Sequence, residues 1–328
     1  MTNPLSPFFE NVISIFSSQK GESVLGIDIG SSAIKVVQLK NRRGTAVLET
    51  YGEIALGPYA NMEIGRSANL PPEKLTQALA DVLKESNTTT KLCAVAIPFS
   101  ASLISLIKMP AVARKQLSEM VPIEARKYIP VPISEVTLDW FAIPEEEGNI
   151  SGDGAREESD PHRSIDVLLV AIRNDVINTY QNIIRDAGLS VSFFEIEVFS
   201  TVRAVLEHGI APVCIIDMGA SNTKLYIVEH GIVRESHIIN RGAQDVTISI
   251  SRALGISVAR AEELKRQFGV EGGAGVQEKE GGGQLGEIAH LSLDFTFSEA
   301  NRTLLNYQNK HRKNITQVIL TGGGSALK

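Results

Sequence analysis

The feature that most constrains the fold of this chain is an internal duplication. An apolar run over 24–29 ends in Asp28-Ile29 and leads into Gly30-Ser31-Ser32, and a second run over 213–217 ends in Asp217 and leads into Met218-Gly219-Ala220-Ser221. Each motif is followed by further strand-like segments, so each opens a meander of strands joined by tight turns. One Asp-x-Gly turn would be weak evidence, because most such turns are ordinary. Two copies, too far apart for a solenoid repeat, predict two related lobes.

Both turns carry residue types that suit phosphate. Backbone N–H groups and hydroxyls in a concave arc bind phosphate oxygens, and Lys35 can neutralise phosphate charge. An aspartate beside each turn would repel bare phosphate, so we expect a divalent cation between them, bound through water as Mg²⁺ prefers. The predicted Mg²⁺ residues are Asp28 and Asp217. The predicted phosphate ligands are Gly30, Ser31, Ser32, Lys35, Gly219, Ala220 and Thr223.

Two later segments complete the candidate site on the nucleoside side. Three glycines after a predicted buried strand allow close approach of a flat ligand, although they suit a tight strand-to-helix turn equally well. Glu262, Lys265 and Arg266 share one face of a predicted helix, and a solvated ion-pair surface is the alternative interpretation. The candidate residues here are Glu262, Lys265, Arg266, Gly322, Gly323, Gly324 and Ser325.

Composition narrows the class of protein. Apolar residues make up 43% of the chain, which excludes wholesale disorder. The net charge of −6 argues against a nucleic-acid protein held by a broad basic face. The two cysteines, Cys93 and Cys214, lie in apolar runs and suit a reducing compartment. We find no apolar stretch long enough to span a bilayer and expect a cytoplasmic protein that approaches a membrane only through partners.

The periodicity predicts an α/β protein with mixed sheets. Strands are expected over 24–29, 34–39, 46–56, 92–97, 103–109, 136–143, 165–172, 191–197, 213–217, 224–228, 232–239 and 318–320. Helices are expected over 72–85, 113–128, 174–187, 198–208, 244–254, 258–268 and 288–311. Pro122 should kink the second of these helices or begin a new one.

Three segments differ from the rest in composition. Residues 145–163 hold seven acidic and two basic side chains, which predicts a solvated loop, with an acidic metal site as the alternative. Residues 271–286 hold seven glycines and predict a flexible loop. Residues 1–22 place phenylalanines and aliphatic residues at helical spacing, so we expect an amphipathic or flexible segment that packs on its own domain or on a partner.

Together these motifs resemble the actin-like ATPase superfamily. Asp28-x-Gly30-Ser31-x-x-x-Lys35 resembles its first phosphate motif, Asp217-x-Gly219-Ala220-x-x-Thr223 resembles its second, and Gly322-Gly323-Gly324-Ser325 resembles its adenosine motif. Glu262-x-x-Lys265-Arg266 resembles the ribose and adenine contacts of the chaperone branch. Glu195-Ile196-Glu197 resembles the first connecting motif, which implies that Glu197 positions water. The resemblance implies a bilobal fold of ribonuclease H-like duplicated lobes that binds ATP and Mg²⁺.

Within this superfamily the chain is most similar to the PilM family of type IV pilus assembly, in the branch that also contains FtsA. The most specific stretches are residues 26–39 and 124–132, with 166–171 and 187–189 in addition. The resemblance implies an FtsA-type inserted subdomain and binding of the N-terminal cytoplasmic segment of PilN, a membrane protein. It also implies contact with other pilus assembly components. An extended peptide in a groove is a plausible mode of recognition.

The expected domain organisation follows from this resemblance. We expect an N-terminal segment over 1–22, the first lobe over 23–91 with its connecting helix over 194–212, the inserted subdomain over 92–193 and the second lobe over 213–328. The family normally continues past the triple glycine, so we expect the chain to be a truncated fragment. Val198, Ala243 and Pro122 depart from the family pattern, but none of them removes a phosphate ligand.

Three functions compete at this point. The first is a nucleotide-dependent scaffold with weak or no ATPase activity. The second is a sugar-kinase-type phosphotransferase, which needs an aspartate base near the phosphates; Asp139 and Asp166 are more easily interpreted as strand-edge residues. The third is an FtsA-like cell-division filament protein. We favour the scaffold, and the sequence leaves homo-oligomerisation open.

Overall fold

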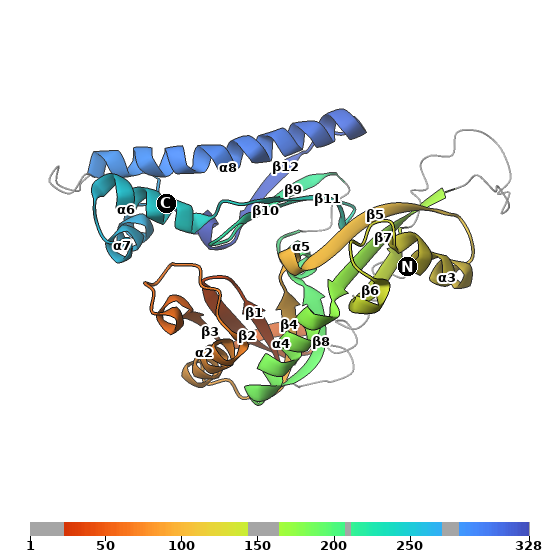
Figure 1. Cartoon of the computed structure of the whole chain (residues 1–328), viewed down its shortest axis with the longest axis horizontal. Coiled ribbons are helices and arrows are strands. Elements are labelled where there is room, and N and C mark those ends of the chain that lie inside the picture. Colours follow the sequence, from red (N-terminus) through yellow and green to blue (C-terminus); the bar gives the residue numbers. More distant parts are fainter. Residues whose placement is uncertain (1–22, 144–163, 207–210, 271–281, 328) are drawn as a thin grey trace.

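The computed structural model describes residues 23–143, 164–206, 211–270 and 282–327. Figure 1 shows three parts: a lower lobe built on β1 to β4 and β8, an upper lobe built on β9 to β12, and a smaller subdomain with β5 to β7 beside them. The expected N-terminal segment over 1–22 and the expected acidic loop over 145–163 lie outside the described residues.

The first lobe is a five-stranded sheet covered by helices. The strand order is β3-β2-β1-β4-β8, in which β1 runs antiparallel to β2 and parallel to β4. Leu79 of α2 and Ile183 of α4 pack with Leu25 and Val95 in one buried core. The strands are β1 (Ser23–Ile29), β2 (Ala33–Arg42), β3 (Thr45–Ala55), β4 (Leu92–Ile97) and β8 (Ser190–Ile196), and the helices are α2 (Pro72–Glu85) and α4 (Asn174–Asp186).

The second lobe repeats this plan. Its strand order is β11-β10-β9-β12, with β9 antiparallel to β10 and parallel to β12. The core between the sheet and its helices contains Ile216, Leu225, Ile250 and Leu293. The strands are β9 (Val213–Met218), β10 (Thr223–Glu229), β11 (Ile232–Ile239) and β12 (Gln317–Thr321), and the helices are α6 (Ala243–Leu254), α7 (Val258–Phe268) and α8 (Gly282–His311). The duplication seen in the sequence is therefore a duplication of topology.

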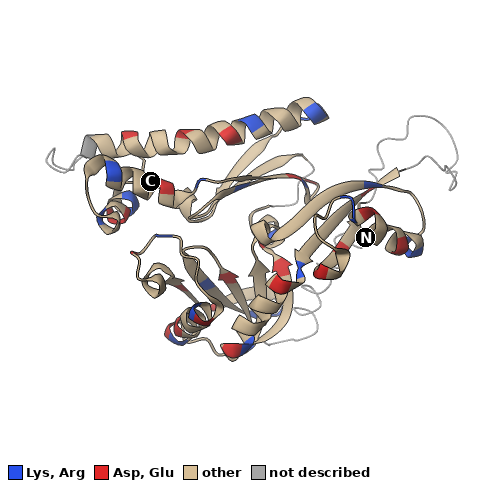
Figure 2. Ribbon diagram, viewed as in Figure 1, with Lys and Arg blue, Asp and Glu red and all other residues tan. Residues whose placement is uncertain are grey.

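The helix ends follow local chemistry. Pro72 occupies the first turn of α2, where its missing N–H leaves no bond unmade. The Ser257 hydroxyl accepts a hydrogen bond of 3.2 Å from the Arg260 amide at the start of α7. The ribbon in Figure 2 is blue, the colour of Lys and Arg, at the carboxyl end of α8. Lys310 lies in this last turn and complements the negative end of the helix dipole.

The third part of the molecule is a small subdomain built on a three-stranded sheet. Its sheet has the order β5-β7-β6, and its helix α3 packs Leu117 and Val121 against Leu169 of β7. Strands β4 and β8 fall inside the expected insertion, but they pair with each other and with β1 in the first-lobe sheet. We therefore propose that the insertion runs over 102–173. Its elements are β5 (Ser102–Pro110), α3 (Arg114–Ala125), β6 (Val136–Ala142) and β7 (Ser164–Arg173).

A shared core joins the three parts. It contains Phe99 from the first lobe, Val170 from the insertion, Phe199 from α5 (Glu197–Val205) and Tyr226 from the second lobe. The Phe99 and Tyr226 rings meet edge to face with centroids 5.4 Å apart. This contact packs a residue of the first lobe directly against a residue of the second lobe.

Most predicted elements are confirmed to within a few residues, and some details are corrected. Pro122 lies inside α3 without starting a second helix. Helix α5 ends at Val205, short of the expected His208, which lies outside the described residues. The expected glycine-rich loop over 271–286 is wrong at its end, because 282–286 form the first residues of α8; the rest of it, 271–281, is not described.

Candidate functional site

The two duplicated turns adopt the same backbone geometry. The Gly30 amide donates to the Ala33 carbonyl at 3.0 Å, and the Gly219 amide donates to the Asn222 carbonyl at 3.0 Å. A Cβ atom on Gly30 would lie 3.0 Å from the Ala33 carbonyl oxygen, and one on Gly219 would lie 2.9 Å from that of Asn222. A glycine is required at both positions by the same close approach, so the turns are structural equivalents.

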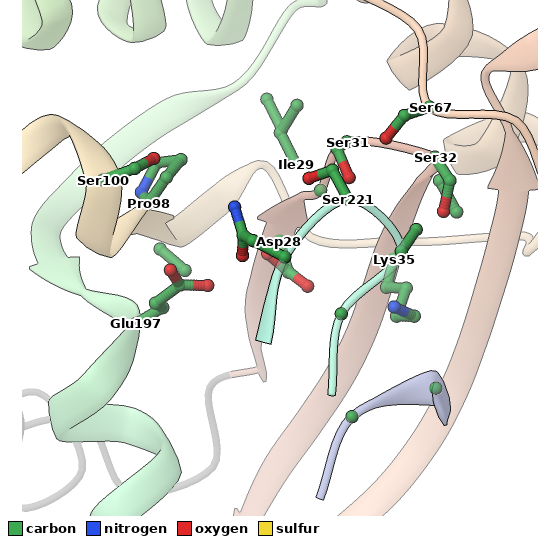
Figure 3. Close-up of a pocket in the computed structure, with 18 of the residues that line it drawn as sticks. Asp28, Ile29, Ser31, Ser32, Lys35, Ser67, Pro98, Ser100, Glu197 and Ser221 are labelled. Atoms are coloured by element: carbon green, nitrogen blue, oxygen red, sulfur yellow. The ribbon is translucent and has the colours of Figure 1, made fainter. Parts of the chain in front are cut away.

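The turns face a cavity of about 670 Å³ between the lobes. Figure 3 shows Asp28, Ser31 and Lys35 of the first lobe and Ser221 of the second lobe around this space. The predicted residues that line it are Asp28, Gly30, Ser31, Ser32, Lys35, Glu197, Asp217, Gly219, Ala220, Gly322 and Gly323. Residues that are far apart in the sequence thus line the same cavity.

Asp28 supplies a carboxylate from the first lobe to the lining of the cavity. Burial raises its pKa, the charges of Lys35 and Lys224 lower it in part, and the charge of Asp217 raises it further. Among the described residues, none donates a hydrogen bond to this carboxylate or lies in an ion pair with it. It is therefore available to a cation or to a hydrated ligand.

The carboxylates of Asp217 and Glu197 both accept hydrogen bonds from Lys224. The Lys224 ammonium lies 2.8 Å from Glu197 Oε2 and 3.3 Å from Asp217 Oδ2, and Glu197 Oε1 accepts a 2.6 Å bond from the Phe99 amide. Burial raises the pKa of Glu197, and Lys224 offsets part of that rise. Burial lowers the pKa of Lys224, but Glu197 and Asp217 outweigh it and hold this pKa above its ordinary value. Lys224 therefore remains an ammonium.

Sequence reasoning missed Lys224, although a signal was present. In the strand ladder, Lys35 of β2 lies opposite Asp28 of β1, and Lys224 of β10 lies opposite Asp217 of β9 in the same register. The duplicated motif therefore extends to a lysine in both copies. Lys35 was identified because it completes the first phosphate motif, and its counterpart could have been found by aligning the copies.

The glycine-rich segment divides into two parts. Gly322 has φ +82°, and a Cβ atom there would lie 2.4 Å from Asp217 Oδ1, so only glycine fits this approach. Gly324 packs on Met218, and the Ser325 hydroxyl donates to the Gly322 carbonyl at 2.7 Å. Gly322 and Gly323 line the cavity, whereas Gly324 and Ser325 support the turn behind it.

On α7, Glu262 and Lys265 form a buried ion pair away from the lining of the cavity. Glu262 Oε2 lies 2.7 Å from Lys265 Nζ, and Glu262 Oε1 accepts a 2.7 Å bond from Arg266 Nε. The Thr247 hydroxyl also donates to Glu262 at 2.7 Å. Burial raises the pKa of Glu262, but the charge of Lys265 and the hydrogen bonds from Lys265, Thr247 and Arg266 together outweigh burial and leave the pKa lowered. Arg266 is exposed, so it is the member of this set most accessible to a ligand.

A first-lobe segment over 65–68 bridges to the second lobe beside this network. The Ser67 amide donates to Gln244 Oε1 at 3.1 Å, and the Ala68 amide donates to the Ser31 carbonyl at 2.9 Å. A Cβ atom on Gly65 would lie 2.5 Å from the Glu262 Cδ atom. This segment therefore contacts α6 and α7, where the sequence predicts nucleoside contacts.

Thr223 lies behind the second turn. Its side chain is buried, and its hydroxyl donates to the Arg241 carbonyl at 2.8 Å. In this structure the hydroxyl supports the strand leaving the turn, and Thr223 is not among the residues that line the cavity.

The residues fit a hydrated divalent cation at one wall of the cavity. No group of three or more metal-ligating side chains occurs among the described residues. A hydrated Mg²⁺ needs only one or two carboxylates. Asp28 offers both carboxylate oxygens, whereas Asp217 shares Oδ2 with Lys224. Asp28 would therefore be the principal residue holding Mg²⁺.

Two lobes of one topology, with paired turns facing a cavity, define an actin-like fold. The family model described as "Type IV pilus assembly protein PilM" matches residues 26–277. The chain therefore belongs to the PilM family of type IV pilus assembly proteins.

Solved structures and curated relatives agree with the fold. A structure titled "PilM-PilN type IV pilus biogenesis complex" is 24% identical and superposes with a TM-score of 0.71, covering 93% of this chain and 82% of that chain. The ethanolamine utilization protein EutJ from Carboxydothermus hydrogenoformans is 12% identical, with a TM-score of 0.55 over 100% of this chain and 81% of that one. The cell division protein FtsA of Pseudomonas aeruginosa is 24% identical over 77% of this chain, and the match spans 62% of that protein.

No helix in the described part of the chain is long and apolar enough to cross a membrane.

Proposed function

We propose that this protein is an ATP- and Mg²⁺-binding scaffold of type IV pilus assembly, cytoplasmic and held near the inner membrane by its partners. The observation that carries the proposal is the cavity of about 670 Å³ lined by both duplicated turns. The amides of Ser31, Ser32 and Ala220 and the hydroxyls of the two serines would bind phosphate oxygens. Asp28 would hold Mg²⁺ through water, with a lesser contribution from Asp217.

The charge arrangement favours a scaffold over an enzyme with rapid turnover. Among the described residues, the carboxylates lining the cavity are those of Asp28, Glu197 and Asp217. Both oxygens of Glu197 are occupied by Lys224 and the Phe99 amide, so it is poorly placed to activate water. Asp139 and Asp166, considered above as kinase bases, do not line this cavity. We expect weak or no ATPase activity, well below the roughly 1–100 per second typical of kinases.

We further propose that the inserted subdomain receives the N-terminal cytoplasmic segment of a PilN-like membrane protein. Its β5 and β6 are edge strands, to which an extended peptide can add. Between α3 and β6 lie two cavities of about 450 and 300 Å³, and Trp140 lines both. Leu117 and Phe141 give the smaller cavity apolar walls, and the larger one is lined by Arg114, Lys115 and Asp139.

Calorimetric titration of Mg-ATP tests the nucleotide site. Asp217→Ala should weaken binding at least about tenfold, a loss of ~1.4 kcal/mol. The matched control is Asp186→Ala, because Asp186 lies on α4 with an exposed side chain. Unchanged affinity in a folded Asp217→Ala variant would contradict the assignment, and multiple turnover at kinase rates would contradict the scaffold.

The same titration, repeated with a PilN N-terminal peptide, tests coupling. ATP should strengthen peptide binding, and the peptide must then strengthen ATP binding by the same factor. Trp140 is the single tryptophan of the chain, so its fluorescence reports directly on the α3–β6 groove. Saturable peptide binding that leaves this fluorescence unchanged would place the peptide elsewhere.

A further inference from the structure

A lysine joins the two lobes at the back of the cavity. Glu197 begins α5 on the first-lobe side, while Asp217 and Lys224 face each other across β9 and β10. The Lys224 ammonium lies 2.8 Å from Glu197 and 3.3 Å from Asp217, and all three side chains are largely buried. Lys224 also lines the cavity itself. It can therefore contact a ligand without leaving its carboxylate partners.

The ammonium retains capacity for a ligand. A lysine has three N–H donors, and the two contacts to Glu197 and Asp217 account for two of them. The charged residues on the cavity wall are Asp28, Glu197, Asp217, Lys35 and Lys224. The lysines neutralise only part of the acidic charge, so a polyphosphate entering this space needs every cation within reach.

We infer that Lys224 acts as a tethered cation for the phosphates of a bound nucleotide, doing at Asp217 what a hydrated divalent cation does at Asp28. The inference rests on the proposed nucleotide site and adds a binding residue to it. Lysine contacts phosphate as a point charge. Because the chain already supplies the positive charge on the second lobe, nucleotide binding depends less on the divalent cation than two open aspartates would require.

A purely structural role is the alternative interpretation. Lys224 bridges carboxylates from the two lobes, so its loss would lower stability whatever its contact with ligand. Such a role would not change how strongly nucleotide affinity depends on Mg²⁺. The Mg²⁺ dependence is therefore the readout that separates the two roles.

The experiment compares ATP affinity in excess Mg²⁺ and in excess EDTA. For the unaltered protein, EDTA should weaken ATP binding by less than about tenfold. In Lys224→Gln, Asp217 is left without its cation, so EDTA should weaken binding at least about tenfold more than in the unaltered protein. Lys40→Gln is the matched control, because Lys40 is also paired with a carboxylate, at 3.9 Å from Glu49, and does not line the cavity.

A second variant keeps the test interpretable if Lys224→Gln fails to fold. Lys224→Gln with Glu197→Gln removes one positive and one negative charge, so the net charge of the cluster is unchanged while Asp217 still lacks its ammonium. Circular dichroism checks folding, and this double variant should show the same steep Mg²⁺ dependence. An equal EDTA effect in the unaltered protein and a folded variant overturns the inference while the nucleotide site stands. Absence of ATP binding by the unaltered protein in Mg²⁺ overturns both.

Discussion

The two duplicated turns share a backbone but differ in electrostatics. Each has a glycine amide bonded to the carbonyl three residues later at 3.0 Å, and each has an aspartate opposite a lysine in the adjacent strand. In the second lobe this lysine pairs with Asp217 and Glu197, whereas within the described residues Lys35 forms no ion pair. The comparison teaches that the two copies share the backbone of the turn but differ in the partners of their side chains, so that Asp28 is open while Asp217 is paired with Lys224.

The largest test of this difference removes each lysine in turn. Lys224→Met leaves two largely buried carboxylates without their cation and should cost about 3–5 kcal/mol of unfolding free energy. Lys35→Met removes no ion pair formed by described residues and should cost less than about 1 kcal/mol. Urea unfolding of the two variants measures the difference. Similar losses for both would mean that the two turns are electrostatically alike.

The backbone similarity is tested with glycine substitutions. Gly219→Ala and Gly30→Ala each place a methyl group against a backbone carbonyl at 2.9 and 3.0 Å, so both should cost about 1–3 kcal/mol. Gly26→Ala is the control in β1, the strand that leads into Gly30, because its Cβ would make an ordinary 3.7 Å contact. Thermal unfolding compares the three. If only one turn tolerates alanine, the turns are not equivalent.

The local sequence pattern was enough to predict the two duplicated turns. The paired Asp-x-Gly motifs predicted two meanders, and the strands beside them lie within a few residues of expectation. Register also follows from these motifs, because each short turn fixes which residues of adjacent strands face one another. The turns and the aspartates beside them could therefore be assigned to one cavity from sequence alone.

Long-range pairing set the limits of prediction. We expected β4 and β8 to belong to the insertion. In the structure β4 pairs with β1 and β8 pairs with β4, and no local sequence signal reports such long-range pairing. The bridge from Lys224 to Glu197 joins residues of different lobes, so no local spacing reports it. The α7 set has helical spacing typical of a ligand-binding or solvated face, and only the packing shows that Glu262 is buried against Thr247 and Lys265.

The smallest expected effect concerns the sign of each aspartate's contribution to stability. Burial raises the pKa of Asp28 above its ordinary value of 3.8, so its ionised form destabilises the folded state at neutral pH. Asp28→Asn should therefore raise the unfolding temperature at pH 7. This gain should shrink as the pH falls through the raised pKa, because the protonated carboxyl carries no such penalty.

Asp217→Asn should have the opposite sign. It weakens the charged contact with Lys224 and should cost about 1.5–3 kcal/mol, the range of hydrogen bonds to charged groups. Thermal unfolding of both variants between pH 4 and pH 7 separates the two aspartates. Stabilisation by Asp28→Asn together with loss of Mg-ATP binding would show that the first lobe holds an unpaired buried charge for its ligand. Destabilisation by both changes would mean that Asp28 is as well neutralised as Asp217, and that the asymmetry between the lobes does not exist.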